Sequence, residues 1–181
     1  MDQGLLPRRY AKALYKFAAE KDATKAVYTC MQNIEAAFAA NPTMQTTLAN
    51  PFVSTADKKA IVTAAAGKDA DKLSTLADFV TLLVENRRID ILREIALAYT
   101  RLYRKANNIY AVRIVSAAPL DNADQQRLRA LVDKHLDGGT AEYTFAVDPD
   151  LIGGFTVSIE NERLDASVRN ELEQLRLILK K

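Results

Sequence analysis

Apolar side chains recur at spacings of three and four residues from the start of the chain to about residue 106, which is the period of amphipathic α-helices. The pattern predicts six helices joined by short connections, as in an α-helical bundle. In chain order they cover residues 5–20, 23–40, a short segment up to 48, 54–66, an apolar stretch from Leu73 to a turn at 85–88, and 90–106.

The fifth predicted helix is apolar on more than one side. Val80 and Leu83 fall on one face at helical spacing, and Phe79 and Leu82 widen the apolar stripe beyond half of the cylinder. A helix of this kind must be surrounded, either by its own chain or by a partner. It is too short to span a bilayer, which needs about 20 unbroken apolar residues. We therefore expect no direct membrane insertion and a central place for this helix in the bundle.

Polar and glycine residues mark several helix ends. Ser54 is followed three residues later by Asp57, and Asp121 by Asp124, which is the spacing of an N-terminal capping arrangement. Gly67 follows the fourth predicted helix, where a residue with positive φ commonly ends a helix.

The period of the pattern changes near residue 107. Tyr110, Val112 and Ile114 alternate with their neighbours, which predicts a strand. A helix follows from Asp121, then strands near 143–147 and 155–159 separated by a Gly153-Gly154 bend, and a last helix with Asp165 as its cap. The order strand, helix, strand, strand, helix is typical of a small α+β unit. The expected fold is mainly α, with an N-terminal six-helix bundle over residues 1–106 and an α+β C-terminal domain over residues 107–181.

Composition supports a globular protein with two differently charged parts. Hydrophobic residues make up 49% and charged residues 27% of the 181 residues, Trp is absent, and the net charge is +2. Residues 1–106 hold 16 Lys and Arg against 11 Asp and Glu, and residues 107–181 hold 9 against 12, so the parts carry +5 and −3. Opposite signs suggest different partners, although solvated surfaces explain them equally well. The single cysteine fits a reducing compartment.

Residues with catalytic or metal-binding potential are scattered. His135 is the only histidine and has no cysteine or second histidine at zinc-ligand spacing, so we expect it on the surface. Cys30 lies on a helix flank and is expected to be a buried or idle thiol. Gly67-Lys68 lacks the Ser or Thr and the upstream glycine of a phosphate-binding loop. We therefore expect no catalytic residues, no metal, no cofactor and no small-molecule ligand.

Basic pairs raise the possibility of nucleic-acid binding. They occur at Arg8-Arg9, Arg87-Arg88 and Arg104-Lys105. The pairs are dispersed, balanced by acidic residues and poor in neighbouring aromatics, whereas a dedicated nucleic-acid surface is usually more basic. Solvated helix ends are the favoured interpretation.

Apolar side chains remain as candidates for contact with other proteins. In one interpretation, five of them bind a partner's amphipathic helix that lies against the first and fifth helices. In the other, all five are core residues, and periodicity alone leaves both interpretations open. The residues concerned are Tyr10, Ala13, Phe17, Phe79 and Leu82.

Three segments together resemble a known family. They are Arg9-Tyr10-Ala11-Lys12-Ala13-Leu14, Glu85-Asn86-Arg87-Arg88-Ile89, and the run from Val147-Asp148-Pro149-Asp150-Leu151-Ile152-Gly153-Gly154-Phe155 through Leu164-Asp165-Ala166-Ser167-Val168-Arg169. In order and spacing they are similar to the delta subunit of the F-type ATP synthase, whose mitochondrial counterpart is the oligomycin-sensitivity-conferring protein. The last segment is the most specific. Arg87 and Asp150 depart from residues common in that family.

The resemblance implies a structural role without an active site. Such a stator subunit links the catalytic head to the peripheral stalk, so that rotor torque is coupled to ATP synthesis. The N-terminal bundle would hold the N-terminal helix of an alpha subunit against its first and fifth helices. The resemblance thus favours partner contact for Tyr10, Ala13, Phe17, Phe79 and Leu82.

The same resemblance implies that the C-terminal domain meets a b-type stalk subunit, and Leu172, Leu175 and Leu179 of the last helix are the candidate contacts. Because the amino terminus lacks the features of a transit segment, we expect a bacterial protein held peripherally on the cytoplasmic face of the inner membrane. The alternative is an RNA-binding helical adapter resembling antitermination factors, which the strand-rich C-terminal part disfavours.

Overall fold

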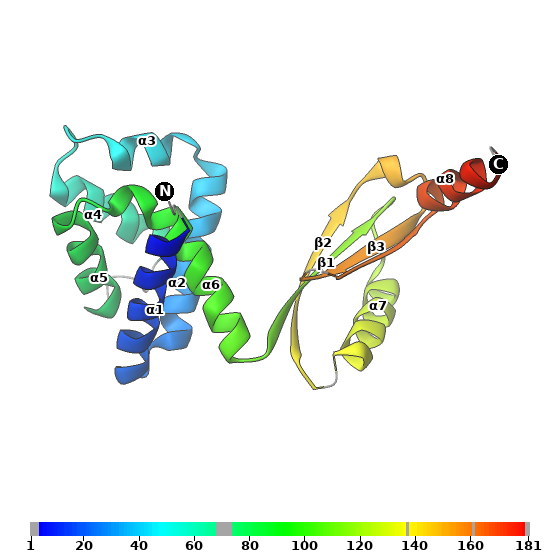
Figure 1. Ribbon diagram of the computed structural model, residues 1–181, viewed down its shortest axis with the longest axis horizontal. Coiled ribbons are helices and arrows are strands. Elements are labelled where there is room, and N and C mark those ends of the chain that lie inside the picture. Colours follow the sequence, from blue (N-terminus) through cyan, green and yellow to red (C-terminus); the bar gives the residue numbers. More distant parts are fainter. Residues whose placement is uncertain (1–3, 68–73, 137, 161, 180–181) are drawn as a thin grey trace. The chain divides into compact units, whose positions relative to one another are not determined.

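The computed structural model describes residues 4–67, 74–136, 138–160 and 162–179, which form a mainly helical protein with one four-stranded sheet (Figure 1). The chain divides into two compact units, Met1–Tyr103 and Arg104–Lys181. The predicted start of the fifth helix at Leu73 lies outside the described residues. Each unit is described by itself below.

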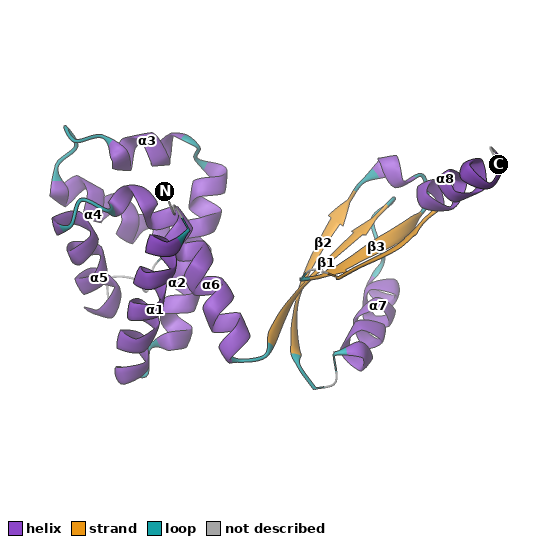
Figure 2. Cartoon of the chain, in the orientation of Figure 1, coloured by secondary structure: helices purple, strands orange, loops and turns teal. Residues whose placement is uncertain are grey.

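The first unit is built from helices. In chain order they are α1 (Leu5–Glu20), α2 (Thr24–Ala40), α3 (Thr43–Ala49), α4 (Thr55–Ala66), α5 (Ser74–Glu85), the short 3₁₀ helix η2 (Ile89–Ile91) and α6 (Leu92–Ala106). Helix α1 contacts α2 and α5, and α4 contacts α2 and α5 (Figure 2). The helical spacing read from the sequence therefore corresponds to real helices in this part of the chain.

The core of the first unit contains a buried tyrosine. Tyr99 of α6 is fully buried, and its hydroxyl donates a hydrogen bond to the Thr24 carbonyl at 3.1 Å. Its ring centroid lies 5.9 Å from that of Tyr15 on α1. Burial raises the pKa of Tyr99 well above its ordinary value of 10, because the low-dielectric core disfavours the phenolate. Other fully buried side chains of this unit include Leu14, Met31, Ile34, Leu83 and Ile95.

The predicted helix starts at Ser54 and Asp121 are confirmed. The Ser54 hydroxyl accepts a hydrogen bond from the Asp57 backbone N–H at 3.1 Å. The Asp121 carboxylate accepts one from the Asp124 N–H at 2.7 Å. Each bond satisfies a donor that the first turn of a helix leaves without a partner. The predicted end at Gly67 is also confirmed, since α4 stops at Ala66 and Gly67 has φ +100°.

The second unit combines a sheet with two helices. In chain order it contains β1 (Ile109–Ser116), α7 (Asn122–His135), β2 (Thr140–Val147), the 3₁₀ helix η3 (Pro149–Leu151), β3 (Gly154–Ile159), β4 (Glu162–Ser167) and α8 (Val168–Leu179). The strand order is β2-β1-β3-β4. Strands β1 and β2 are parallel and joined through α7, whereas β3 is antiparallel to both β1 and β4. Val112, Ile114 and Val157 of the sheet pack with Leu128 and Val132 of α7.

Strand β4 corrects the sequence-based prediction. We expected three strands in this unit and Asp165 as the cap of the last helix, but Asp165 lies within β4. The cap is Ser167, whose buried hydroxyl accepts from the Asn170 N–H at 3.2 Å and donates to the Asp165 carboxylate at 2.6 Å. That hydrogen bond holds the pKa of Asp165 below its usual value, since it favours the ionised form. Asp165 therefore orients the cap without being the cap.

The predicted bend at Gly153-Gly154 is present where β3 begins. Gly154 has φ +74°, a conformation that side-chain-bearing residues rarely adopt. A Cβ atom there would collide with the carbonyl oxygen of Ala166 on the neighbouring strand. Glycine is thus required for β3 and β4 to approach each other at this point.

Candidate functional site

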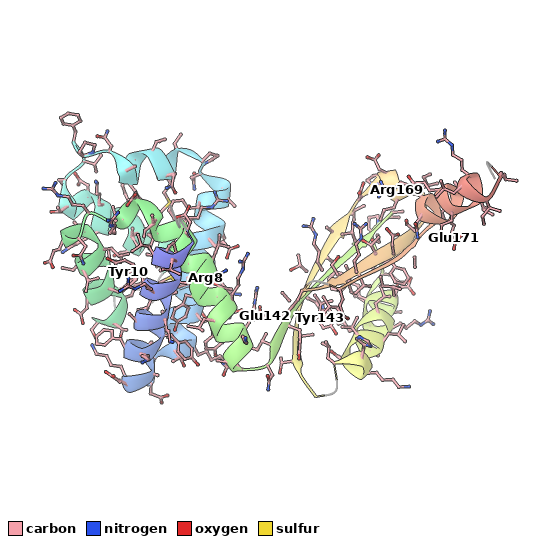
Figure 3. All side chains as sticks on the ribbon, viewed as in Figure 1. Arg8, Tyr10, Glu142, Tyr143, Arg169 and Glu171 are labelled. Atoms are coloured by element: carbon pink, nitrogen blue, oxygen red, sulfur yellow. The ribbon has the colours of Figure 1, made fainter. Side chains whose placement is uncertain are left out.

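Helix α1 carries an incompletely buried apolar stripe. Leu6, Tyr10, Ala13 and Phe17 follow one another at spacings of four, three and four, which places them on one side of the helix. Leu6 and Ala13 are exposed, and Tyr10 and Phe17 are half-buried. The residues that pack inward, Pro7, Ala11, Leu14 and Ala18, lie on a different side. In Figure 3, Tyr10 and Arg8 project to different sides of α1.

Helix α5 contributes one exposed leucine beside a buried phenylalanine. Leu82 is 44% exposed, while Phe79, one turn earlier, is only 7% exposed. Phe79 is therefore largely satisfied by its own unit, and Leu82 is the apolar side chain that α5 offers to the outside. The term α1/α5 face is used below for Leu6, Tyr10, Ala13, Phe17, Phe79 and Leu82.

A charged contact joins the two helices at one end of this face. The Lys21 ammonium, just after α1, lies 3.4 Å from the Asp78 carboxylate and 3.5 Å from the Ser74 hydroxyl on α5. It also lies 4.3 Å from the centre of the Phe17 ring. Because the end of α1 thus meets the start of α5, the two neighbouring helices run antiparallel.

The placement of the predicted residues separates them into two kinds. Phe79 lies in the core, whereas Tyr10, Ala13, Phe17 and Leu82 all retain exposure on α1 and α5. Leu6 was missed from the sequence, although its spacing of four from Tyr10 was a usable signal. The side chains on α1 and α5 that stay exposed form an apolar surface, and such a surface suits a partner helix with an apolar face.

Helix α8 has no buried residue. Val168, Leu172, Leu175 and Leu179 lie at spacings of four, three and four, so one side of the helix is apolar. The exposed fractions of Leu172, Leu175 and Leu179 are 51%, 55% and 86%. Figure 3 labels Arg169 and Glu171, polar residues of its first turn. An amphipathic helix without a buried residue is suited to a contact with another chain.

An apolar cavity in the second unit was not predicted. It measures about 400 Å³ and lies between α7 and strands β3 and β4, with Leu128, Leu131, Phe155, Val157 and Leu164 in its lining. Leu131 and Leu164 are more than 60% exposed. We refer to this feature as the α7/β4 cavity.

The cavity exists because one helix covers only part of the sheet. On β2, the Tyr143 hydroxyl donates to the Asp133 carboxylate of α7 at 2.6 Å, and Arg129 of α7 lies over the rings of Tyr143 and Phe145. These contacts hold α7 over the β2 side. A helix is about 10–12 Å wide and four strands span roughly 15–20 Å, so the β3 and β4 side stays open. The spacing of apolar residues along the chain does not show which part of a sheet its helices leave uncovered, so this cavity could not be predicted from the sequence.

The sequence offered a cysteine, a histidine and three basic pairs as candidates for catalysis, metal binding or nucleic-acid binding. Cys30 is buried. The exposed His135 imidazole lies 3.7 Å from the Glu162 carboxylate at the rim of the α7/β4 cavity. The Arg104 guanidinium, from one of the basic pairs, binds the Glu142 carboxylate of β2 at 2.8 and 3.0 Å. Within the described ranges, no group of three or more His, Cys, Asp or Glu is placed to hold a metal ion.

None of the helices in the described ranges combines the length and the apolar character needed to cross a bilayer. The α1/α5 face, helix α8 and the α7/β4 cavity are largely apolar surfaces. Exposed apolar surfaces in both units are typical of a protein that docks to other chains.

Comparison with known proteins makes the assignment specific. The family model "ATP synthase delta (OSCP) subunit" matches residues 6–179. The chain is 36% identical to ATP synthase subunit delta of Parabacteroides distasonis, over 97% of this chain and 96% of that protein. It is 33% identical to ATP synthase subunit delta of Bacteroides thetaiotaomicron, over 97% and 94%. The chain belongs to the ATP synthase delta (OSCP) subunit family.

A solved structure has the same fold. A chain of the mitochondrial ATP synthase hexamer of Toxoplasma gondii matches with a TM-score of 0.72 and 23% identity, over 97% of this chain and 98% of that one. The family membership identifies a non-catalytic subunit with a stator role in ATP synthase, peripheral in a membrane-bound complex. The alternative of an RNA-binding adapter receives no support from these matches.

Proposed function

We propose that the chain links the catalytic head of the synthase to its peripheral stalk through two separate apolar surfaces. Residues 1–106 act as a six-helix bundle that binds the N-terminal helix of an alpha subunit, and residues 107–181 bind the end of a b-type stalk subunit. The complex places the chain on the cytoplasmic face of the inner membrane. The observation that carries this proposal is that each unit leaves an amphipathic surface uncovered.

The head contact in this proposal uses the α1/α5 face. An amphipathic partner helix packs its apolar side against Tyr10, Ala13, Phe17 and Leu82, while Phe79 supports Leu82 from the core. Removing apolar surface from water stabilises the contact by about 25 cal/mol per Å² before the costs of association are subtracted. A helix with a continuous apolar stripe is therefore a better partner for this face than a polar loop.

The stalk contact uses helix α8. Leu172, Leu175 and Leu179 offer a stripe about two helical turns long, and each of the three side chains is at least half exposed. The α7/β4 cavity, in the same unit, is a second candidate position for the stalk, since it is apolar and Leu131 and Leu164 at its lining are exposed. We favour α8 because none of its residues is buried, and the α7/β4 cavity is the competing position.

The mechanical consequence follows from rotary coupling. Torque from the rotor acts on the head, and the head must be held by a link that resists it. Such a link requires tight binding at both ends and needs no catalytic group. This requirement agrees with a chain whose candidate surfaces are apolar and whose polar residues pair with each other, as Arg104 does with Glu142.

A bridging experiment tests both contacts at once. A peptide of the cognate alpha subunit's N-terminal residues is immobilised, and retention of a b-type stalk fragment is measured with and without the full chain. We expect retention only when the chain is present. Leu82→Asp should reduce capture of the chain itself, whereas Leu175→Asp should preserve its capture and reduce retention of the stalk fragment. Retention of the fragment that neither substitution reduces would contradict the proposal.

A further inference from the structure

The two helices of the α1/α5 face carry opposite charges. Helix α1 holds four basic residues and one acidic residue, for a net charge of +3. Helix α5 holds two acidic residues and no basic one, for a net charge of −2. The apolar face therefore lies between a positive helix and a negative helix.

The charged side chains stand beside the apolar stripe in matching positions. On α1, Arg9 and Lys16 flank Ala13 at spacings of four and three; on α5, Asp78 and Glu85 flank Leu82 at the same spacings. Residues three and four apart are neighbours on a helix surface. Arg9 and Lys16 are termed the basic wall below, and Asp78 and Glu85 the acidic wall.

All four wall residues are exposed in the structure. Asp78 is partly neutralised by Lys21 at one end of the face, so Glu85 is the stronger acidic group. Glu20, the acidic residue of α1, lies near the same end. Lys12, three residues after Arg9 and four before Lys16, is a neighbour of both basic-wall residues. Arg8 also belongs to α1 but projects to a different side from Tyr10 (Figure 3).

We infer that these walls select the direction in which a partner helix lies on the α1/α5 face. This inference rests on the proposed head contact and specifies its partner: an amphipathic helix with acidic side chains along one flank and basic side chains along the other. With its apolar side down, such a helix places its acidic flank against the basic wall in one direction only. Turning it end to end exchanges the flanks and brings like charges together.

The directional preference has a functional value. Apolar burial alone is non-directional, and a stripe of leucines fits almost equally well in either direction. Charges at the rim of an interface fix register and suppress wrong arrangements more than they raise affinity. A stator link requires one defined geometry, which the walls supply.

Two designed peptides test the inference directly. Both have the same leucine stripe and the same numbers of Glu and Lys, but the Glu and Lys flanks are exchanged between them. Their composition and net charge are therefore identical, so general electrostatic attraction cannot separate them. Binding to the full chain is measured by fluorescence anisotropy at low ionic strength, with the alpha-subunit peptide as a reference ligand.

The wild-type chain should bind one peptide roughly fivefold more tightly than the other, as expected for a few exposed charge pairs. The difference should shrink as salt is added. The triple variant Arg9→Glu, Lys16→Glu, Glu85→Lys, which keeps the Lys21–Asp78 contact, should reverse the preference. The control Arg8→Glu changes the net charge of the chain by −2, as the triple variant does (−2 −2 +2), and should leave the preference in place.

Equal affinity of the wild-type chain for both designed peptides, or a preference that the triple variant leaves unchanged, would overturn the directional inference. If the alpha-subunit peptide still binds in that case, the proposed head contact stands. If the folded chain binds neither the designed peptides nor the alpha-subunit peptide, the proposed head contact fails together with the directional inference.

Discussion

The ammonium of Lys21 lies 3.4 Å from the carboxylate of Asp78, and this contact joins the end of α1 to the first turns of α5. The two side chains are 39% and 60% exposed, so the ion pair contributes little to stability, on the order of 0.2–1 kcal/mol. It links the two helices that carry the α1/α5 face, and the Lys21 ammonium also lies over the Phe17 ring. The face is thus formed by two neighbouring antiparallel helices.

Phe79 and Leu82 should respond differently to truncation. Phe79→Ala should lower the free energy of unfolding by about 3–5 kcal/mol, because it removes a buried ring and leaves a cavity. Leu82→Ala should cost less than about 1 kcal/mol, since that side chain is 44% exposed, yet it should weaken binding of the alpha-subunit peptide. Urea unfolding and peptide titration of both variants check this. An equal loss of stability in the two variants would show that Leu82 is a core residue.

Tyr99 should make the first unit sensitive to alkali. Its pKa in the folded chain is raised well above 10, so the unfolded chain loses the phenol proton first as the pH rises. The unfolded state then binds fewer protons, and stability falls above pH 10 by up to about 1.4 kcal/mol per pH unit for this group. Below pH 10 the contribution is constant.

The matched variants are Tyr99→Phe and Tyr10→Phe. Tyr99→Phe should cost about 1 kcal/mol at neutral pH, because the Thr24 carbonyl loses its donor, and should make the alkaline decline shallower. Tyr10→Phe, at a half-buried position, should keep the decline. Thermal unfolding followed by circular dichroism between pH 7 and 11 measures both. If stability declines as steeply with pH in Tyr99→Phe as in the wild-type chain, titrating groups other than Tyr99 cause the decline.

Leu175 and Leu131 distinguish the two candidate positions for the stalk. If α8 binds the stalk, Leu175→Asp should weaken binding of a b-type fragment by about tenfold or more, through the lost burial of one leucine. Leu131→Asp, at the α7/β4 cavity and of similar exposure, should have little effect. Sedimentation velocity with the fragment gives both affinities. The reverse order of effects would move the contact to the α7/β4 cavity.

Local sequence signals predicted the helices and their ends well. Ser54 with Asp57 and Asp121 with Asp124 identified two helix starts, because a cap is formed by residues three apart in the chain. Gly67 identified a helix end for the same reason. Such features depend on neighbouring residues alone, so they can be read without knowing the fold.

Features that depend on distant residues were not predictable in this way. Strand β4 was missed because Leu164 is its only large apolar residue, and an edge strand with one exposed side has a weak alternating pattern. Phe79 and Leu82 have similar periodicity, and only the packing of α5 shows that one is buried and the other is not. The α7/β4 cavity arises from a sheet wider than one helix, which no local pattern encodes.

The proposed head contact is measured by calorimetric titration of the full chain with a peptide of the cognate alpha subunit's first 20 or so residues, a length of about 30 Å as a helix. We expect one peptide bound per chain with a negative heat-capacity change, as apolar burial requires. Leu82→Asp should weaken the affinity by about tenfold or more, while Ala130→Asp, an equal charge change at an exposed position of α7, should leave it unchanged. If the folded chain binds no peptide, or if folded Leu82→Asp keeps the wild-type affinity, the α1/α5 face does not bind the alpha subunit.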